Sequence, residues 1–93
     1  MMGARLVIPD SEAFELKEIM RRTGGRVSES TLRRWNAKYG ISRQAGRNAK
    51  HEFSIVAVVI LQHGDIDALE LLREWKRTDP RLAPYFHASG VSA

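Results

Sequence analysis

The side chains best suited to binding chemistry gather in the middle third of the chain. Residues 31–53 hold one acidic side chain, Glu52, and six basic ones, so this segment alone carries the surplus behind the net charge of +4. The six basic residues are Arg33, Arg34, Lys38, Arg43, Arg47 and Lys50. A local positive field favours a polyanion, because each phosphate contact releases condensed counterions. On charge alone, a solvated basic face without a partner is an equal alternative.

Patterns for catalysis and metal binding are missing from the sequence. His51, His63 and His87 have no paired ligand spacing, and the absence of cysteine excludes thiolate metal sites and disulfides. There is no Ser/His/Asp arrangement, glycine-rich phosphate loop or carboxylate pair, and Gly24-Gly25 is better explained as a helix stop. We therefore expect no enzymatic activity, no cofactor and no metal.

Length and hydropathy indicate one small domain in the cytoplasm. The 93 residues leave no room for a second core, and 43% hydrophobic with 28% charged residues is ordinary for a globular chain. The longest apolar run, residues 55–61, is far shorter than the roughly 20 residues that span a bilayer. The apolar start is ended by Pro9-Asp10, unlike a secretory signal.

Two helices are predicted, one before the basic segment and one that extends into it. The first covers residues 15–22 and is stopped by Gly24-Gly25. The second begins after Ser28, whose hydroxyl suits an N-cap accepting from the amide of Ser30 or Thr31, and ends at Gly40. Val27 and Leu32 have the spacing of a hydrophobic staple across this cap.

The second helix has two distinct faces. Leu32, Trp35 and Tyr39 form one apolar stripe at helical periodicity, which we expect to face the core. The opposite face centres on Ser30 and Ala37, flanked by Arg33 and Arg34. Its hydrogen-bond donors, with room around them, suit base edges in a major groove.

A β-hairpin is predicted next, with short extended segments at residues 41–44 and 49–53 around a turn that contains Gly46 and Asn48. Arg43, Arg47 and Lys50 would stud this hairpin and could lie against a nucleic-acid backbone or minor groove. The alternative is an ordinary basic loop. Phe53, where the hairpin meets the following helix, is expected in the core.

The remaining chain predicts two helices and two terminal segments. Residues 55–61 contain five β-branched residues, yet Ser54 as a cap and Gly64 as a stop favour a buried helix over residues 54–63. A last helix over residues 65–78, closed by Pro80, would bury Ile66, Leu69, Leu72 and Trp75 on one face. Residues 1–13 are expected to form a flexible arm. In the tail, residues 81–93, Leu82, Tyr85 and Phe86 would either complete the core or contact a partner or a neighbouring copy.

These elements predict a helix-turn-helix whose second helix enters a DNA groove by its N-terminal half. Arg33 or Arg34 would bind guanine bidentately, while Ser30 and Thr31 would bind phosphate or cap the helix. Arg26 and Lys38 flank the helix and are weaker candidates for phosphate contacts. Solvated surface charge remains the alternative for each of these basic residues.

An ordered set of residues runs through the first half of the chain: Phe14-Glu15-Leu16-Lys17-Glu18-Ile19, Thr23-Gly24, Val27-Ser28 and Thr31-Leu32-Arg33-Arg34-Trp35. Followed by a hairpin and by His51-Glu52-Phe53-Ser54, this order resembles the MerR-type winged helix-turn-helix over about residues 14–63. The resemblance implies a mainly α-helical DNA-binding domain with a small β-hairpin wing, placed here at residues 14–80. It matches Ser30, Arg33 and Arg34 to the recognition helix and, more loosely, Arg43, Arg47 and Lys50 to the wing.

Within that superfamily, the short chain is more similar to the excisionases of phages and integrative elements, also called recombination directionality factors. It has no long C-terminal coiled coil and no cysteine effector site, unlike metal- or drug-sensing regulators. The resemblance implies a bacterial, nucleoid-associated protein that binds repeated sites on double-stranded DNA cooperatively, bends DNA and directs a tyrosine integrase towards excision. A small repressor is equally compatible with the sequence. An antiactivator that sequesters a regulator through the apolar tail is the competing interpretation.

Overall fold

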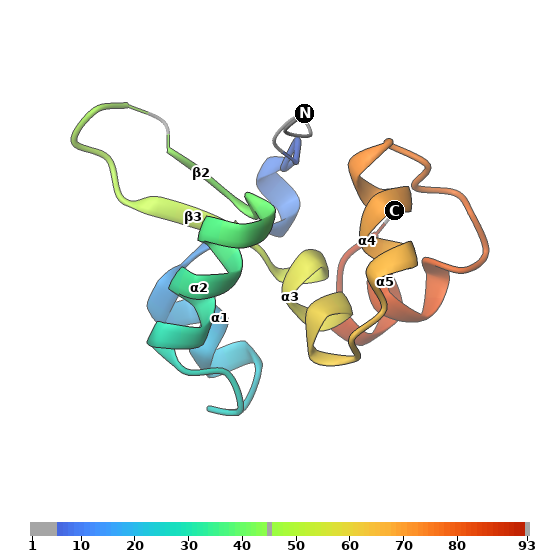
Figure 1. Ribbon diagram of the computed structural model, residues 1–93, viewed down its shortest axis with the longest axis horizontal. Coiled ribbons are helices and arrows are strands. Elements are labelled where there is room, and N and C mark those ends of the chain that lie inside the picture. Colours follow the sequence, from blue (N-terminus) through green and yellow to red (C-terminus); the bar gives the residue numbers. More distant parts are fainter. Residues whose placement is uncertain (1–5, 45, 93) are drawn as a thin grey trace.

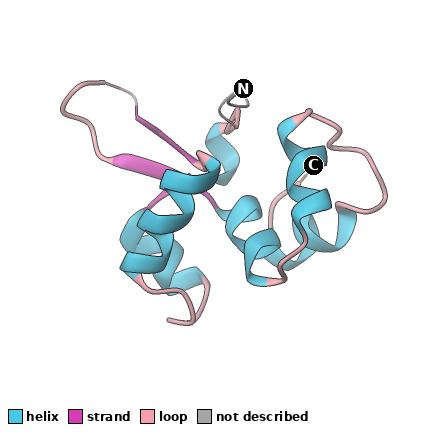
Figure 2. Ribbon diagram, in the orientation of Figure 1, coloured by secondary structure: helices cyan, strands magenta, loops and turns pink. Residues whose placement is uncertain are grey.

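The computed structural model describes residues 6–44 and 46–92. Within them the chain is mainly α-helical with a small antiparallel sheet (Figures 1 and 2). The helices are α1 (Leu16–Arg22), α2 (Glu29–Tyr39), α3 (Ile55–Gln62), α4 (Ile66–Arg73) and α5 (Ala83–Ser89), preceded by a short 3-10 helix, η1 (Asp10–Glu12). The strands are β1 (Ala13–Glu15), β2 (Ser42–Gln44) and β3 (His51–Ser54), in the order β1-β3-β2. None of the helices in the described ranges has the length and apolar character needed to cross a membrane.

Helices α1 and α2 form where local signals predict them, and they lie side by side below the hairpin in Figure 1. Ser28 caps α2, and its hydroxyl oxygen accepts from the amide of Thr31 at 3.2 Å. Val27 and Leu32, the predicted staple pair, are both buried. Gly40 ends the helix with φ of 66°, a left-handed conformation that glycine adopts without a Cβ penalty. The predicted start and end of α2 are confirmed.

The predicted hairpin is confirmed as β2 and β3, but the sheet has a third strand. Strand β1 pairs antiparallel with β3, with Phe14 opposite Phe53 and Glu15 opposite Glu52. Strand β1 was not predicted, because it is only three residues long and pairs with a segment about 40 residues away. The central strand β3 therefore joins the chain before α1 to the hairpin.

Helix α3 is the centre of the core. All residues from 55 to 61 are buried, so apolar neighbours surround the helix on every side. Ser54 caps it by accepting from the amide of Ala57 at 3.1 Å. The cap and the complete burial outweigh the β-branched composition, and the predicted helix is confirmed.

Helix α4 ends at Arg73, so the prediction of a helix through residue 78 is wrong. Trp75 has φ of 63°, and the amide of Lys76 donates to the carbonyl of Leu71 at 2.9 Å, which makes a Schellman-type end. The turn also places Trp75 outside the core, where 52% of it is exposed. Ile66 is exposed as well, and the buried face contains Ala68, Leu69, Leu71 and Leu72.

Neither terminal segment is a separate arm or tail in the described residues. Leu6 and Ile8 are buried, so the flexible arm predicted for residues 1–13 is corrected from residue 6 onward; residues 1–5 lie outside the described ranges. Leu82 and Phe86 are buried in the same core, and α5 packs against α3. Of the two possibilities for the tail, it completes the core.

Tyr85, the remaining residue of the possible partner surface, also makes contacts within the chain. Its hydroxyl donates to Oδ2 of Asp65 at 2.6 Å, and its ring meets His63 edge to face. This hydrogen bond, together with one from the amide of Ala68, lowers the pKa of Asp65, and the same contact raises the pKa of Tyr85. The expected partner surface of Leu82, Tyr85 and Phe86 is therefore replaced by internal contacts.

A buried ion pair holds the N-terminal segment against the α4–α5 connection. Glu12 has no exposed surface, and its Oε2 accepts from Nη2 of Arg77, whose side chain is 10% exposed. Ser54 donates its hydroxyl to the other carboxylate oxygen at 3.3 Å. The Arg77 guanidinium lies over the rings of both Trp75 and Phe86, 4.7 and 4.8 Å from their centroids. Trp75 thus helps to shield the pair from water, which gives its left-handed conformation a structural role.

We expect Glu12→Gln to reduce the free energy of unfolding by about 3–5 kcal/mol, because it leaves the Arg77 charge buried without its counterion. Urea unfolding followed by circular dichroism measures the change. Glu18→Gln, which breaks more exposed pairs with Arg21 and Arg22, is the control and should have a much smaller effect. The double variant Glu12→Gln/Arg77→Met should recover much of the loss. Equal effects of Glu12→Gln and Glu18→Gln would contradict this role.

Candidate nucleic-acid interface

Helix α2 presents its polar side outward. Leu32 is buried and Trp35 and Tyr39 are half-buried, as the stripe predicted. The opposite positions, Ser30, Arg33, Arg34, Ala37 and Lys38, are exposed. Because the apolar stripe fixes the rotation of the helix against the core, the basic side chains of α2 necessarily point to solvent.

Arg33 and Arg34 are neighbours on this face but differ in their contacts. Nε and Nη2 of Arg33 lie 2.9 and 2.8 Å from one oxygen of Glu29, one helical turn earlier. Arg34 makes no ion pair or side-chain hydrogen bond within residues 6–44 and 46–92. The Arg34 side chain is therefore available in full, whereas Arg33 is held by an acidic neighbour.

Ser30 and Thr31 belong to the cap of α2. The Ser28 hydroxyl lies 3.1 Å from that of Ser30 and donates to Oγ1 of Thr31 at 3.0 Å. Of the two roles predicted for Ser30 and Thr31, their contacts support capping, although Ser30 remains exposed at the start of the helix.

The hairpin carries two exposed cations of the three predicted. Arg47 in the turn has no ion pair in the described part of the chain, and Lys50 makes only a loose one, with Nζ 3.8 Å from a carboxylate oxygen of Glu15. The side-chain amide of Gln44 donates to the carbonyls of Arg47 and Ala49 and so closes the turn across its base.

Arg43, for which a DNA contact is predicted, directs its guanidinium at partners within the chain. Its Nε donates to Glu52 at 3.0 Å, its Nη1 to the carbonyl of Ile8 at 2.7 Å, and its Nη2 to Asp10 at 2.6 Å. The hydrogen bonds to Asp10 and then Glu52 raise the pKa of Arg43. Since all three guanidinium nitrogens have acceptors in the chain, Arg43 fastens the N-terminal segment to the hairpin.

A groove of about 420 Å³ runs between the start of α2 and the sheet. Three cations from three different elements line it: Lys17 of α1, Arg33 of α2 and Lys50 beside β3. The groove also contains two carboxylates, with apolar and aromatic side chains at its floor; its other lining residues are Glu15, Leu16, Glu29, His51 and Phe53. The sequence analysis did not single out Lys17, Glu15 or Glu29, because only the fold brings α1 and β1 beside the hairpin.

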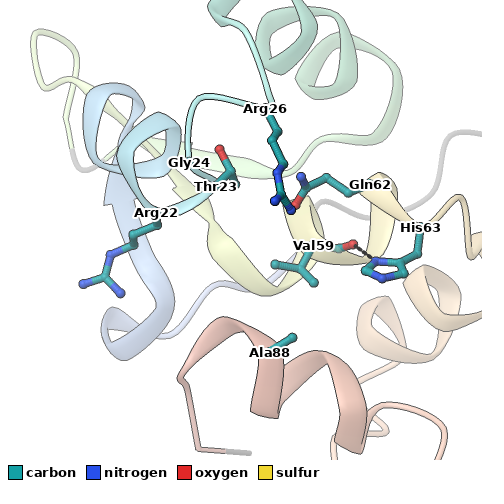
Figure 3. A pocket seen from close by; sticks show the side chains of 8 residues that line it. All are labelled: Arg22, Thr23, Gly24, Arg26, Val59, Gln62, His63 and Ala88. Atoms are coloured by element: carbon teal, nitrogen blue, oxygen red, sulfur yellow. Dashed lines mark hydrogen bonds between the residues drawn. The ribbon is translucent and has the colours of Figure 1, made fainter.

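Arg26 lies in a second cleft, of about 610 Å³, between the α1–α2 turn and the ends of α3 and α5 (Figure 3). Its side chain points towards Gln62 and His63, whereas Arg22 points away from the cleft. Nδ1 of His63 is 2.9 Å from the carbonyl of Val59, which fixes the ring. Arg26 is therefore not part of the groove that contains Arg33 and Lys50. Lys38 is also outside that groove and lies over the ring of Tyr39, near the far end of α2.

Two further findings bear on the kind of site. Among the described residues, no group of three or more histidine, aspartate or glutamate side chains is arranged to hold a metal ion. Comparison of the chain with protein families, with curated proteins and with solved structures gives no match. The interpretation of the interface therefore depends on its own geometry and charge.

We expect Arg43→Ala to lower the free energy of unfolding by about 1–2 kcal/mol, because it removes three hydrogen bonds from a partly exposed charged group. Lys50→Ala, with its loose pair to Glu15, should leave stability nearly unchanged. Urea unfolding of both variants measures the difference. The structural role of Arg43 would be contradicted if the two variants were equally stable.

Proposed function

We propose that this chain binds double-stranded DNA sequence-specifically, with α1 and α2 as a helix-turn-helix and the β2–β3 hairpin as a wing. The observation that carries the proposal is the groove in which cations from α1, α2 and the hairpin converge. A polyanion that follows this groove would meet Lys17, Arg33 and Lys50 together, with Arg34 and Arg47 exposed on the same two elements.

The two elements have different tasks in this proposal. The N-terminal half of α2 enters the major groove, where Arg34 and Arg33 can donate to guanine. The wing lies along the backbone, where Arg47 and Lys50 bind phosphates without reading sequence. Arg43 supports the wing from behind by tying it to residues 8 and 10.

DNA-binding assays over a range of salt concentrations test the proposal. With about six phosphate contacts, the plot of log affinity against log salt should have a slope near −5. Arg34→Ala should relax base preference and cost about 1–3 kcal/mol, whereas Lys50→Ala should weaken all sequences alike. Arg81→Ala, on an exposed pair with Asp79 in the α4–α5 connection, is the control for loss of one positive charge. Absent or salt-independent binding by the wild-type protein would refute the proposal.

For the biological role we propose an excisionase, that is, a recombination directionality factor, or a small repressor that binds DNA in the same way. The resemblance of residues 14–63 to the MerR-type order and the small size of the chain support this assignment. Repeated sites, DNA bending and a tyrosine integrase as partner follow from the resemblance. Copies bound side by side would need contacts other than Leu82, Tyr85 and Phe86, since these pack internally.

An excision assay separates the two roles. Expression of the chain together with the integrase encoded by the same element should increase the excised product if the chain is an excisionase. The Arg34→Ala variant should lose this effect, because it fails to hold the recombination site. Unchanged excision, with repression of a reporter placed behind the same DNA site, would instead assign the repressor role.

The competing role, an antiactivator that captures a regulator through an apolar tail, loses its supporting feature. Leu82 and Phe86 are 0% and 4% exposed, so they offer no docking surface in the folded chain. No other observation in the described residues favours this role over DNA binding.

A further inference from the structure

The groove proposed to face DNA contains acidic side chains beside two of its cations. Glu29 is the first residue of α2 and pairs with Arg33, while Glu15 ends β1 and pairs with Lys50. All four line the same groove. A carboxylate in a surface that approaches phosphates is repelled by them, so these two residues oppose binding to DNA in general.

The stability gained from these pairs is too small to explain their position. The side chains of Arg33 and Glu29 are 66% and 53% exposed, and exposed pairs at this spacing contribute little to folding. Glu29 also sits at the positive end of the α2 dipole, which adds a modest stabilisation. The ion pair and the interaction with the helix dipole would stabilise the fold equally well on a face of the molecule that does not approach DNA.

The geometry of the Arg33–Glu29 pair is specific. Nε and Nη2, which form one edge of the planar guanidinium, both approach the same oxygen, Oε2 of Glu29. The end edge, formed by Nη1 and the second hydrogen of Nη2, makes no hydrogen bond or ion pair in the described part of the chain. That end edge presents two parallel donors, which is the arrangement that binds O6 and N7 of guanine.

We infer that Glu29 is a positioning residue that turns Arg33 from a general phosphate-binding cation into a reader of guanine. This inference rests on the proposed function. Glu29 occupies the side edge of the guanidinium, restricts its orientation and leaves its end edge open to a ligand. The negative charge of Glu29, reinforced by Glu15 across the groove, simultaneously penalises contacts with phosphates. Selectivity is gained at the expense of affinity for arbitrary DNA.

The test compares wild-type protein, Glu29→Gln, Arg33→Ala and the double variant on two probes. One probe is a duplex selected by the wild-type protein from a random-sequence pool, and the other is the unselected pool. Glu29→Gln should bind the pool about threefold more tightly, with a salt slope steeper by about one, because Arg33 becomes free for a phosphate. The ratio of affinities for the selected and unselected probes should fall at least fivefold, with loss of preference at one guanine.

Two comparisons make the result decisive. The double variant should show the same preference at that guanine as Arg33→Ala alone, since Glu29 acts there through Arg33. Glu18→Gln changes net charge by the same amount on α1, outside the groove, and should leave the affinity ratio unchanged. An unchanged ratio in Glu29→Gln, or an equal fall in Glu18→Gln, would overturn the inference. Failure of the wild-type protein to bind DNA at all would instead refute the proposed function on which it rests.

Discussion

The buried pair between Glu12 and Arg77 is the constraint on which the arrangement of the chain depends. A charge without exposed surface must meet its counterion, so residue 77 of the α4–α5 connection has to lie against residue 12. Ser54 joins the two: its hydroxyl donates to Glu12, accepts from the amide of Ala57 to cap α3, and its own amide donates to the carbonyl of Ile41. One small cluster therefore fixes β1, the exit from α2, the end of β3 and the start of α3.

The basic residues divide according to whether the chain supplies their counterions. Arg77 and Arg43 have their guanidinium groups directed at internal acceptors, and both hold segments that are distant in sequence. Arg34 and Arg47 have no such acceptors in the described residues. Net charge does not distinguish these two sets of residues, since every arginine adds one positive charge to the total. The contacts do distinguish them, because the guanidinium groups of Arg34 and Arg47 are left exposed to solvent.

Much of the fold was predictable because its signals are local. The cap at Ser28, the staple across it, the stop at Gly40 and the cap at Ser54 each involve residues within about five positions of one another. The missed features depend on distant partners. Strand β1 needs β3, and Arg77 reaches Glu12 across 65 positions, while Trp75 adopts a conformation for which tryptophan carries no sequence signal. The basic face of α2 was predictable because its signals are local. The internal role of Arg43 was not, because its partners Ile8 and Asp10 are distant in sequence.

The position of the β2–β3 hairpin relative to α2 follows from the interior of the molecule. Strand β3 is bound on one side by β1 and on the other by β2, and Arg43 ties the outer strand back to residues 8 and 10. Helix α2 is fixed independently by the burial of Leu32. Its exit meets the hairpin where the amide of Ser54 binds the carbonyl of Ile41. The spacing between the cations of α2 and those of the hairpin is thus set before any ligand arrives, so the proposed binding of DNA would not require these two elements to be ordered at the same time.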